Sequence, residues 1–301
     1  MKDIYILGSL NTDLTVYLDR YPEKGETVKG HSFRTGAGGK GLNQAFAAAK
    51  LGGHVHFLGA VGKDAFGETM VAQLKSVGVD VSSVHVREDI ASGVALIEVC
   101  HGENEIALDL GANETIQEKE IDAFLANAKP GDLFLTQGEN NADSLTKSLQ
   151  KAHQLGLKTL LNPAPANKAM AESFADVDLV IPNETEASLL SGKPSYEEAA
   201  KSFQVPNVVV TLGKEGYFVL NKDGSYHEPA ISVEAIDTTG AGDAFCGALC
   251  YFLSNDKPLK ESLKLASVYA SMSTLKKGSS ASMADLPSFI SFLKERHLNL
   301  L

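Results

Sequence analysis

Short apolar runs rich in β-branched residues alternate with amphipathic helical patterns along most of this 301-residue chain. Strands that alternate with helices favour a mostly parallel sheet covered by helices on both faces, because crossover helices join parallel strands. The sequence therefore predicts an α/β fold. Strands are predicted at residues 4–7, 55–60, 133–136, 158–161, 179–181 and 208–211, and helices at residues 41–51, 65–77, 117–127, 143–155, 184–190, 241–253 and 259–276.

Two stretches break this rhythm, residues 14–35 and 92–110. In the first, Leu14 and Val16 alternate with polar residues before a turn sequence that contains proline and glycine. In the second, apolar residues recur at every other position up to Leu110. Both patterns predict antiparallel strands inserted in the α/β core, which together form a small sheet with one apolar face. Such a sheet would cover a pocket, contact a second subunit, or do both; an ordinary edge hairpin is the alternative.

The charge balance is acidic, because 27 Lys and Arg residues against 38 Asp and Glu residues give a formal net charge of −11. Nucleic acids and anionic membranes bind basic surfaces, so neither is expected as a partner. No run approaches the roughly 18 apolar residues of a membrane span, and the N-terminus predicts a short strand rather than a signal peptide.

The cysteines and the length indicate where the chain works and how it is organised. Cys100, Cys246 and Cys250 lack the spacing of a metal site, and we expect reduced thiols in the core of a cytoplasmic protein. The length is ample for a buried core. We expect one domain over residues 1–301 that carries the two insertions.

A glycine-rich turn at residues 237–243 opens a strongly helical run. Unpaired backbone N–H groups at a helix N-terminus bind anions, and Gly240, Ala241 and Gly242 have little or no side chain to obstruct a phosphate. The charge of Asp243 would repel a phosphate, but it suits a base that takes a proton from an attacking hydroxyl. The alternative is an acidic residue that only favours the helix dipole.

A second glycine-rich segment spans residues 36–45. Gly36, Gly38 and Gly41 match the dinucleotide fingerprint, but that motif should directly follow a strand, and here a predicted hairpin intervenes. A phosphate-binding P-loop also fails, because Gly41 rather than Ser or Thr follows Lys40. Bare backbone with Lys40 and Asn43 at a helix start fits hydrogen bonds to sugar hydroxyls better.

The first strand is predicted to end at Asn11 and Asp13. Ligands of open α/β sheets lie beyond the carboxyl ends of the strands. Residues two apart share a face of an extended chain, so an amide and a carboxylate would together face a polyol. An Asx turn that leaves the strand is the alternative.

Asn183 follows the strand predicted to end at residue 181, and Glu186 lies three positions later. The spacing indicates a capping box at the start of a helix. The functional alternative is that Asn183 and Glu186 organise water around Mg²⁺, which keeps much of its hydration and also binds phosphate.

In this order, these segments resemble the ribokinase (PfkB) family of carbohydrate kinases, over essentially the whole chain. The first family pattern, spaced glycines around an asparagine, matches Gly38, Gly39, Gly41, Asn43, Gly52 and Gly62. The second matches residues 237–243 and 247–249. The ribokinase branch is most similar, at residues 39–45, 111–113, 162–166 and 182–187.

The resemblance implies an ATP-dependent transfer of a phosphoryl group to the terminal hydroxymethyl of a pentose, with D-ribose as the first candidate. Asp243 would be the base, and the amides of Gly240, Ala241 and Gly242 the anion hole. The sugar hydroxyls would be bound by Asn11, Asp13, Gly39, Lys40, Asn43, Glu139 and Asp243.

The resemblance also implies the nucleotide and cation sites. ATP would be bound by Asn183, Thr211, Gly213, Lys214, Gly216, Gly242 and Ser267, with the stretch near Ser267 beside adenine. Glu186 would hold Mg²⁺ through water. A structural K⁺ would be bound by Asp237, Thr239, Ser273, Lys276, Gly278 and Ser282, mostly through backbone carbonyls. Residues 14–35 and 92–110 would form a lid that also makes a homodimer.

The sequence departs from the family at Gly36 and Ala37 and at Gly138, just before Glu139, and either change would widen the sugar pocket. The rival substrates are therefore deoxyribose, fructose and a nucleoside. A nicotinamide-dependent oxidoreductase is a more distant alternative that rests on Gly36, Gly38 and Gly41 alone, and a sugar sensor without catalysis would not need Asp243.

Overall fold

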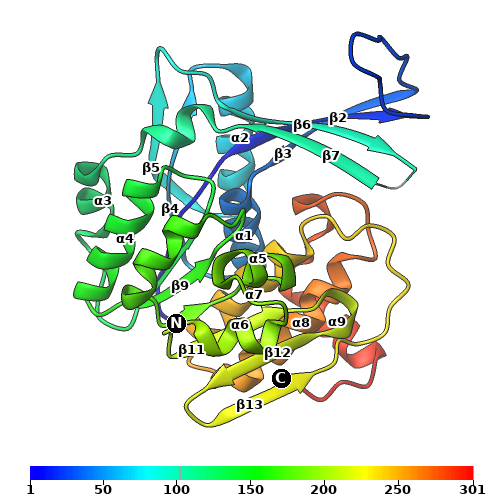
Figure 1. The fold of residues 1–301 in the computed structure, drawn as a ribbon. Helices are drawn as coiled ribbons and strands as arrows, with labels where there is room; N and C mark the ends of the chain where they lie inside the picture. The colour runs from blue at the N-terminus through cyan, green and yellow to red at the C-terminus, as the bar shows by residue number, and fades with distance from the viewer. Residues whose placement is uncertain (102, 301) are drawn as a thin grey trace.

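The computed structural model describes residues 1–101 and 103–300; Gly102, inside the expected 92–110 insertion, and Leu301 lie outside the described residues. A large twisted sheet runs through the centre (Figure 1). Its strands are β1 (Ile4–Leu7), β4 (Val55–Gly62), β5 (Asp80–Arg87), β8 (Leu133–Gln137), β9 (Lys158–Asn162), β10 (Leu179–Val180), β11 (Asn207–Thr211), β12 (Tyr217–Asn221) and β13 (Gly224–Glu228).

The strand order is β13-β12-β11-β10-β9-β8-β1-β4-β5. All neighbours from β5 to β11 pair in parallel, and only β12 and β13 add antiparallel pairs at one edge. The predicted α/β fold with a mostly parallel sheet is confirmed. The sequence reasoning missed β5, β12 and β13, which lie at the edges, where half-exposed strands lack the continuous apolar run of a buried one.

Helices cover both faces of this sheet, so that it separates two apolar cores. Successive residues of β1 point to opposite sides: Ile4 and Ile6 belong to one core, and Tyr5 and Leu7 to the other. The first core is covered by α1 (Lys40–Lys50), α2 (Ala65–Ser76), α7 (Ala241–Ser254), α8 (Leu259–Ser273) and α9 (Leu286–Glu295). The second is covered by α3 (Glu118–Leu125), α4 (Ala142–Gln154), α5 (Glu184–Ser191) and α6 (Tyr196–Ser202).

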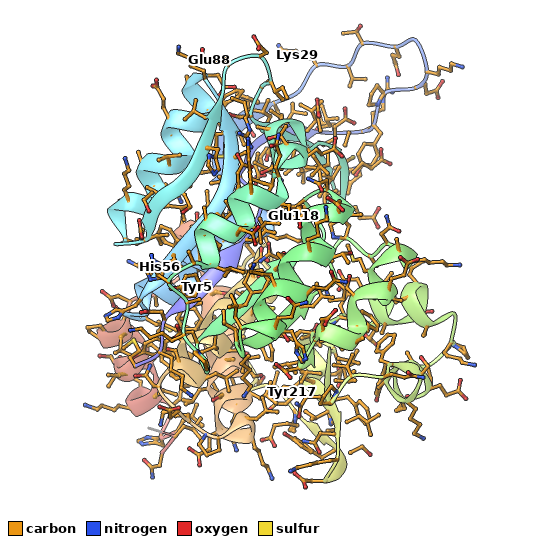
Figure 2. All side chains as sticks on the ribbon, turned by 90° about the vertical axis from the view of Figure 1, so that its left-hand side faces the viewer. Tyr5, Lys29, His56, Glu88, Glu118 and Tyr217 are labelled. Atoms are coloured by element: carbon orange, nitrogen blue, oxygen red, sulfur yellow. The ribbon has the colours of Figure 1, made fainter. Side chains whose placement is uncertain are left out.

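Aromatic contacts tie the second core to the sheet. The Tyr5 ring stacks on His56 of β4 with ring centroids 4.8 Å apart, as Figure 2 shows, and meets Phe124 of α3 edge-on at 5.3 Å. Short 3₁₀ turns complete the connections: η1 (Gly111–Thr115), η2 (Lys168–Asp176), η3 (Gly213–Glu215) and η4 (Ser280–Ser282).

The predicted helices have their expected places, with shifts at the ends. The helix predicted at residues 259–276 ends at Ser273, because the Thr274 carbonyl accepts hydrogen bonds from Ile236 N (2.8 Å) and Asp237 N (3.1 Å) instead of continuing the helix. The sequence reasoning missed α6 and α9. After α8 the chain runs towards the segment that precedes α7. The loop after α8 and the loop before α7, which are distant in the sequence, therefore lie together.

A second, smaller sheet reaches out from the body (Figure 1). Its strands are β2 (Asn11–Leu18), β3 (Ser32–Gly38), β6 (Gly93–Cys100) and β7 (Glu103–Asp109), in the order β3-β2-β6-β7. The pairs β2–β3 and β6–β7 are antiparallel, and β2 and β6 between them pair in parallel. Both insertions therefore meet in one sheet. The strands of the first extend beyond the expected bounds, to Asn11 and Gly38, and those of the second lie within residues 92–110.

The structure corrects the predicted end of the first strand. The chain leaves the large sheet after Leu7, and Asn11 and Asp13 instead begin β2 of the small sheet. They do share a face, opposite Gly38 and Gly36 of β3. The sequence alone did not show this break, because three residues of connection leave no turn signal.

The opposite face of the small sheet is apolar and open. Phe33 of β3 lies opposite Val16 of β2 and is 63% exposed. Leu96 of β6 lies opposite Leu14 of β2 and is 54% exposed. Exposed apolar side chains gathered on one face indicate a contact surface.

Helices α1 and α7 pack unusually closely in the first core, and Gly247 makes this approach feasible. A Cβ atom at Gly247 would overlap the Gln44 carbonyl oxygen and lie 2.6 Å from the Ala47 Cβ. The two helix starts, which carry Asn43 and Asp243, are thereby held next to each other.

Gly247→Ala is expected to lower the free energy of unfolding by about 2 kcal/mol, because the added methyl forces two packed helices apart. Urea denaturation measures the loss. Gly36→Ala is the matched control, since a methyl there meets no atom within 4 Å. An equal loss in both variants would contradict the packing argument.

Candidate active site

The start of α7 places a carboxylate in a buried position. Gly240 is the N-cap in the left-handed conformation, with φ 75°, and Asp243 lies in the first turn with 8% of its surface exposed. Asn43 Nδ2 donates to Asp243 Oδ2 (3.0 Å), and Gln44 Nε2 donates to Oδ1 (2.9 Å). Asp243 is therefore more than a solvated acid at a helix start, because α1 holds both of its oxygens.

The charge of Asp243 is opposed by its surroundings and supported by its partners. Burial raises the pKa of the Asp243 carboxyl, while the nearby Lys40 charge and the hydrogen bonds from Gln44 and Asn43 lower it. A raised pKa suits a group that must accept a proton near neutral pH.

Glu139 joins three segments of the site. It follows β8, and its Oε2 atom accepts hydrogen bonds from Ser9 Oγ (2.5 Å), Asn11 Nδ2 (3.2 Å) and Lys40 N (3.0 Å). The side chain is 7% exposed, and burial raises its pKa. The loop after β8, the start of β2 and the start of α1 are thus fixed relative to one another around one carboxylate.

Asn113 fixes the amide of Asn11. Asn113 Nδ2 donates to Asn11 Oδ1 (2.9 Å), so Asn11 Nδ2 is left to face Glu139. Asn113 is fully buried in η1, and its Oδ1 accepts from Leu10 N (2.9 Å). Gly93 lies against this pair, since a Cβ there would overlap both amides.

Asp13 projects from β2 towards the same cluster. A Cβ at Gly38 would overlap its carboxylate, so the glycine leaves room for it. Burial raises the pKa of Asp13 to about 6, and the negative charges of Glu139 and Asp243 contribute. Asp13 therefore lies within electrostatic reach of both other carboxylates.

Lys40 supplies the positive charge of the cluster. Burial opposes its charge, but the carboxylates of Asp243, Glu139 and Glu186 outweigh burial and raise its pKa. Gly39 before it caps α1 with φ 91°. A Cβ at Gly39 would lie 2.8 Å from Asn11 N, which keeps the start of α1 tight against β2.

One buried acceptor in this cluster has no partner. Within residues 1–101 and 103–300, Asn43 Oδ1 is buried and accepts no hydrogen bond. Unpartnered buried polar atoms are costly. A hydroxyl of a bound ligand would satisfy this atom, so the cluster fits a polyol.

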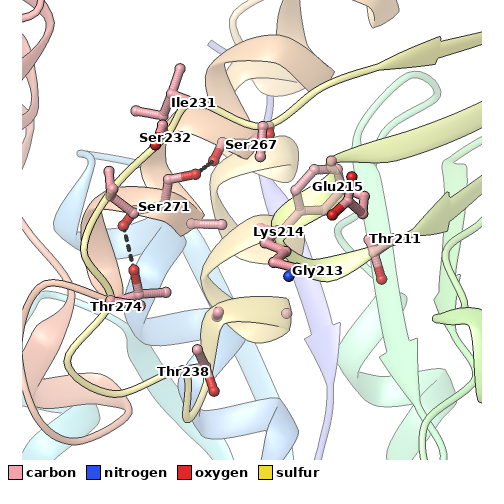
Figure 3. Close-up of a pocket in the computed structure, with 18 residues that line it drawn as sticks. Thr211, Gly213, Lys214, Glu215, Ile231, Ser232, Thr238, Ser267, Ser271 and Thr274 are labelled. Carbon is pink, nitrogen blue, oxygen red and sulfur yellow. Dashed lines mark hydrogen bonds between the residues drawn. The ribbon is translucent and has the colours of Figure 1, made fainter.

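A cavity of about 530 Å³ lies on the other side of the α7 start. In Figure 3, Thr211, Gly213 and Lys214 border it on one side, and Ser267 and Ser271 of α8 with Thr274 just after it on the other. Gly242 and Gly216 also line it. Of the residues expected to bind ATP, only Asn183 is absent from its lining.

Several lining residues of the cavity were missed by sequence reasoning. They lie in the segment between β13 and α7, project from α7 and α8, or follow α8, and core packing explains those on the helices equally well. They are Ala230, Ile231, Ser232, Val233, Ala235, Thr238, Phe245, Ala270, Ser271 and Thr274.

Asn183 and Glu186 form the predicted capping box. Asn183 Oδ1 accepts from Glu186 N (2.8 Å), and Asn183 N donates to Glu186 Oε2 (2.8 Å). Burial raises the pKa of Glu186, which also lies within reach of the Lys40 and Asp243 charges. The structural role is thus present, and it uses only one of the two carboxylate oxygens of Glu186, Oε2.

The loops expected to hold K⁺ meet at Asp237. Its Oδ2 accepts from Gly278 N (2.9 Å), and its Oδ1 accepts from Thr239 N (3.0 Å) and Oγ1 (2.7 Å). Lys276 N donates a hydrogen bond to the Ser273 carbonyl (3.3 Å). Hydroxyl and carbonyl oxygens beside an anion suit a hard monovalent cation, so the residues present fit K⁺. Ser282 lies in the adjoining η4.

The structure contradicts the expectation that Gly138 widens the sugar pocket. A Cβ there would overlap the Met170 side chain and lie 3.0 Å from the Ala164 carbonyl oxygen. Gly138 thus packs the loop after β8 against the segment after β9. Gly36, by contrast, has no neighbour within 4 Å of an added Cβ and stays a candidate for widening.

A family model for the "pfkB family carbohydrate kinase" matches residues 1–286. The chain belongs to this family. A ribokinase from Haemophilus influenzae is 34% identical, covering 97% of this chain and 99% of the relative, and a deoxyribokinase from Salmonella typhimurium is 35% identical, covering 97% and 98%. The structure of a Thermotoga maritima ribokinase is 30% identical with a TM-score of 0.88, covering 98% of this chain and 100% of that one.

Membership of this carbohydrate kinase family removes two alternatives. The nicotinamide oxidoreductase hypothesis is wrong, because the glycine-rich segment connects β3 of the small sheet to α1 instead of following a strand of the parallel sheet. A sugar sensor is not supported either.

In the described ranges, no helix has the length and apolar character needed to cross a bilayer.

Sequence reasoning missed three polar residues of this kinase site. Ser9, Asn113 and Gln44 hydrogen-bond to Glu139, Asn11 and Asp243, respectively. Asn113 and Gln44 lie in segments that were noted only for their family pattern, and Ser9 lies outside every segment that was noted. Their polarity beside apolar neighbours was the available signal.

Asp13→Asn is expected to stabilise this carbohydrate kinase. The folded-state pKa of Asp13 is raised from 3.8 to about 6, so its ionisation opposes folding. The loss of folding free energy caused by this ionisation is absent below the pKa of the unfolded chain, 3.8, and complete above about pH 6. At one pKa unit per about 1.4 kcal/mol, the variant should gain up to about 3 kcal/mol near pH 7.

Urea denaturation at about pH 5 and about pH 8 checks this, with the gain growing towards the higher pH. Asp19→Asn is the control, since this carboxylate in the β2–β3 connection is 93% exposed. A gain in Asp19→Asn of the same size would attribute the effect to net charge instead of burial.

Proposed function

We propose that this kinase transfers the γ-phosphoryl group of ATP to the terminal hydroxymethyl of a pentose, and that D-ribose is converted to ribose 5-phosphate. One observation carries the proposal. The start of α7 has a buried cluster of polyol-binding character on one side, at Asp243, and a cavity on the other, at Gly242. A structure of Arabidopsis thaliana ribokinase complexed with ribose and ATP, 28% identical with a TM-score of 0.88, supports it.

Asp243 is the general base in this proposal. A sugar hydroxyl has a pKa far above 7, so the proton leaves as the O–P bond forms rather than beforehand. Asp243 accepts that proton while Asn43 and Gln44 hold its oxygens. Its burial excludes the water that would otherwise solvate the carboxylate.

The amides of Gly240, Ala241 and Gly242 form the anion hole. Backbone N–H groups at a helix start have no helical partners and stabilise developing negative charge. Ala241 and Gly242 line the cavity on the ATP side. Because Ala241 N donates to the Thr238 carbonyl (3.2 Å), the Gly242 amide is the one best placed to meet a phosphate before that contact opens. An added side chain at Gly242 meets open space, which leaves room for the phosphate.

The sugar is held by the cluster on the opposite side. Asn11, Asp13 and Glu139 face it from the small sheet and from the loop after β8, and Gly39, Lys40 and Asn43 from the start of α1. Asn43 Oδ1 would accept a hydroxyl proton.

ATP occupies the cavity lined by Thr211, Gly213, Lys214, Gly216 and Ser267. Asn183 lies beside this lining, because it forms a β-bridge with Thr211. Mg²⁺ bound with ATP neutralises phosphate charge. Glu186 would hold it through water, because one carboxylate oxygen is used in the capping box and the other is available.

K⁺ would be held by residues of the loops that meet at Asp237, mostly through backbone carbonyls: Asp237, Thr239, Ser273, Lys276, Gly278 and Ser282. The Asp237 carboxylate links the segment before α7 to the Gly278 loop, so a cation there would brace the turn that carries the anion hole. A Cβ at Gly240 would lie 2.8 Å from the Ser279 Cβ, which shows how closely the two loops pack.

The small sheet is the lid of the sugar site, and its outer face forms a homodimer interface in this proposal. Its inner face carries Asp13, and its outer face exposes Phe33 and Leu96. The three cysteines are buried free thiols, in keeping with work in the cytoplasm.

Deoxyribose is the second candidate substrate, because deoxyribokinases from two Salmonella species are 35% identical to this chain. Fructose and a nucleoside remain alternatives. A Burkholderia thailandensis nucleoside kinase shares the fold at 21% identity with a TM-score of 0.82.

Asp243→Asn is expected to lower kcat roughly 10²- to 10⁴-fold, because the proton acceptor is lost. The protein should still fold and bind ATP, because the variant keeps the side-chain shape and one of the two hydrogen bonds from Asn43 and Gln44. ADP release and a nucleotide-binding titration measure the two effects. A kcat near that of the wild type would remove Asp243 from the role of base.

ADP release is measured with ribose, 2-deoxyribose, fructose and adenosine, each with and without K⁺. We expect turnover with ribose or 2-deoxyribose, and we expect K⁺ to increase it. Asp237→Ala should lose the rise with K⁺, because its charge holds the cation loops together. Turnover that depends on fructose or adenosine alone would keep the phosphoryl transfer and overturn the pentose. No turnover with any of them would overturn the proposed function.

A further inference from the structure

Gln44 is a fully buried amide whose hydrogen bonds are almost all fixed by other side chains. Its Nε2 donates to Asp243 Oδ1 (2.9 Å) and to Asn162 Oδ1 (3.0 Å). Its Oε1 accepts from Gln137 Nε2 (2.8 Å). Both donor hydrogens are therefore used, and the amide has one orientation that satisfies its partners.

The chain of amides continues into the sheet. Asn162 ends β9, and its Nδ2 donates to the Ile181 carbonyl (2.8 Å), which follows β10. Gln137 ends β8. Three neighbouring strand ends thus converge on Gln44, and through it on the carboxylate at the start of α7.

Packing alone does not account for an amide at this position. Apart from Asn43, which also donates to Asp243, the buried residues next to Gln44 on α1 are apolar: Leu42, Ala45, Ala47 and Ala48. Among the described residues, Gln137 Oε1 is buried without a hydrogen-bond partner, so the amide chain carries a cost that an apolar core would avoid. A cost retained next to a buried carboxylate points to a role for the carboxylate.

We propose that Gln44 is a positioning residue for Asp243: it holds the carboxylate in one orientation and stabilises its negative charge, while Gln137 and Asn162 fix the Gln44 amide. This inference rests on the proposed function of Asp243 as the base. A hydrogen bond to an ionised group is worth more than one between neutral groups. A Gln44 amide turned by 180° would direct its oxygen at the Asp243 carboxylate, and Gln137 and Asn162 prevent this.

Other charged and titratable groups face Asp243 from every neighbouring element. Lys40 from the start of α1 favours its ionised form. Glu186 from α5, Glu139 from the loop after β8 and Asp13 from β2 oppose it. Cys246 on α7 has a pKa raised well above its ordinary value by burial and stays neutral. Gln44 therefore adds to Lys40 in keeping a crowded carboxylate ionised.

Gln44→Met tests the proposal, because it keeps the side-chain length and removes both donors. The pKa of Asp243 should rise by about one to two units, the value of one hydrogen bond to a charged group. ¹³C NMR of labelled aspartate, titrated in the full-length protein without substrate and assigned with Asp243→Asn, measures it directly. In ADP release, the acid limb of kcat/KM should move to higher pH by the same amount, while KM for ATP stays within about twofold.

Gln137→Met and Asn162→Leu leave the Gln44–Asp243 hydrogen bond in place and loosen only its support. Each should shift the Asp243 pKa in the same direction by roughly half a unit, because the effect passes through one more hydrogen bond. Ser254→Ala is the matched control. The buried Ser254 hydroxyl lies on α7, the helix that carries Asp243, and donates to the Tyr251 carbonyl (2.8 Å). Its removal should lower stability without moving the NMR titration or the pH profile of kcat/KM.

An unshifted Asp243 pKa in folded Gln44→Met overturns the proposal. If Gln44→Met does not fold, unshifted values in both Gln137→Met and Asn162→Leu overturn it. The NMR titration needs no substrate, so a failure of the proposed kinase reaction would leave this result standing. A lowered melting temperature with unchanged pH profiles would assign Gln44 to packing alone.

Discussion

A buried carboxylate at the start of α7 sets the demands that the rest of this structure meets. Asp243 is taken out of water, and its charge must be supported by Lys40 and by the amides of Asn43 and Gln44. These three groups lie within one turn of α1. The molecule therefore depends on a close and rigid contact between two helices that are about 200 residues apart in the chain.

Glycines and strand ends make that contact. Gly247 lets α7 approach α1, and Gly41 lets α1 approach the end of β1, since a Cβ at either position would overlap neighbouring backbone. The site lies at the carboxyl ends of the parallel strands, where such folds bind their ligands. Helix packing and site geometry are thus settled by the same few small residues.

The sequence predicted the parts of this arrangement that have a strong local signal. The strand–helix alternation and the glycine-rich segments near Lys40 and Asp243 located the fold and most of the candidate site. It could not place Asn11 on the small sheet, because three connecting residues leave no periodic signal. It also could not reveal Gln44 and Asn113, because their partners are distant in the chain and only the folded structure brings them together.

The balance of charge around Lys40 bears on the end of a catalytic cycle. One ammonium group is surrounded by the carboxylates of Asp243, Glu139 and Glu186, with Asp13 nearby, so the acidic groups of the site outnumber its one cation. An uncharged sugar enters such a site without electrostatic penalty, whereas a phosphate ester carries close to two negative charges. The cluster would repel that ester, and it would thereby favour product departure and resist its return.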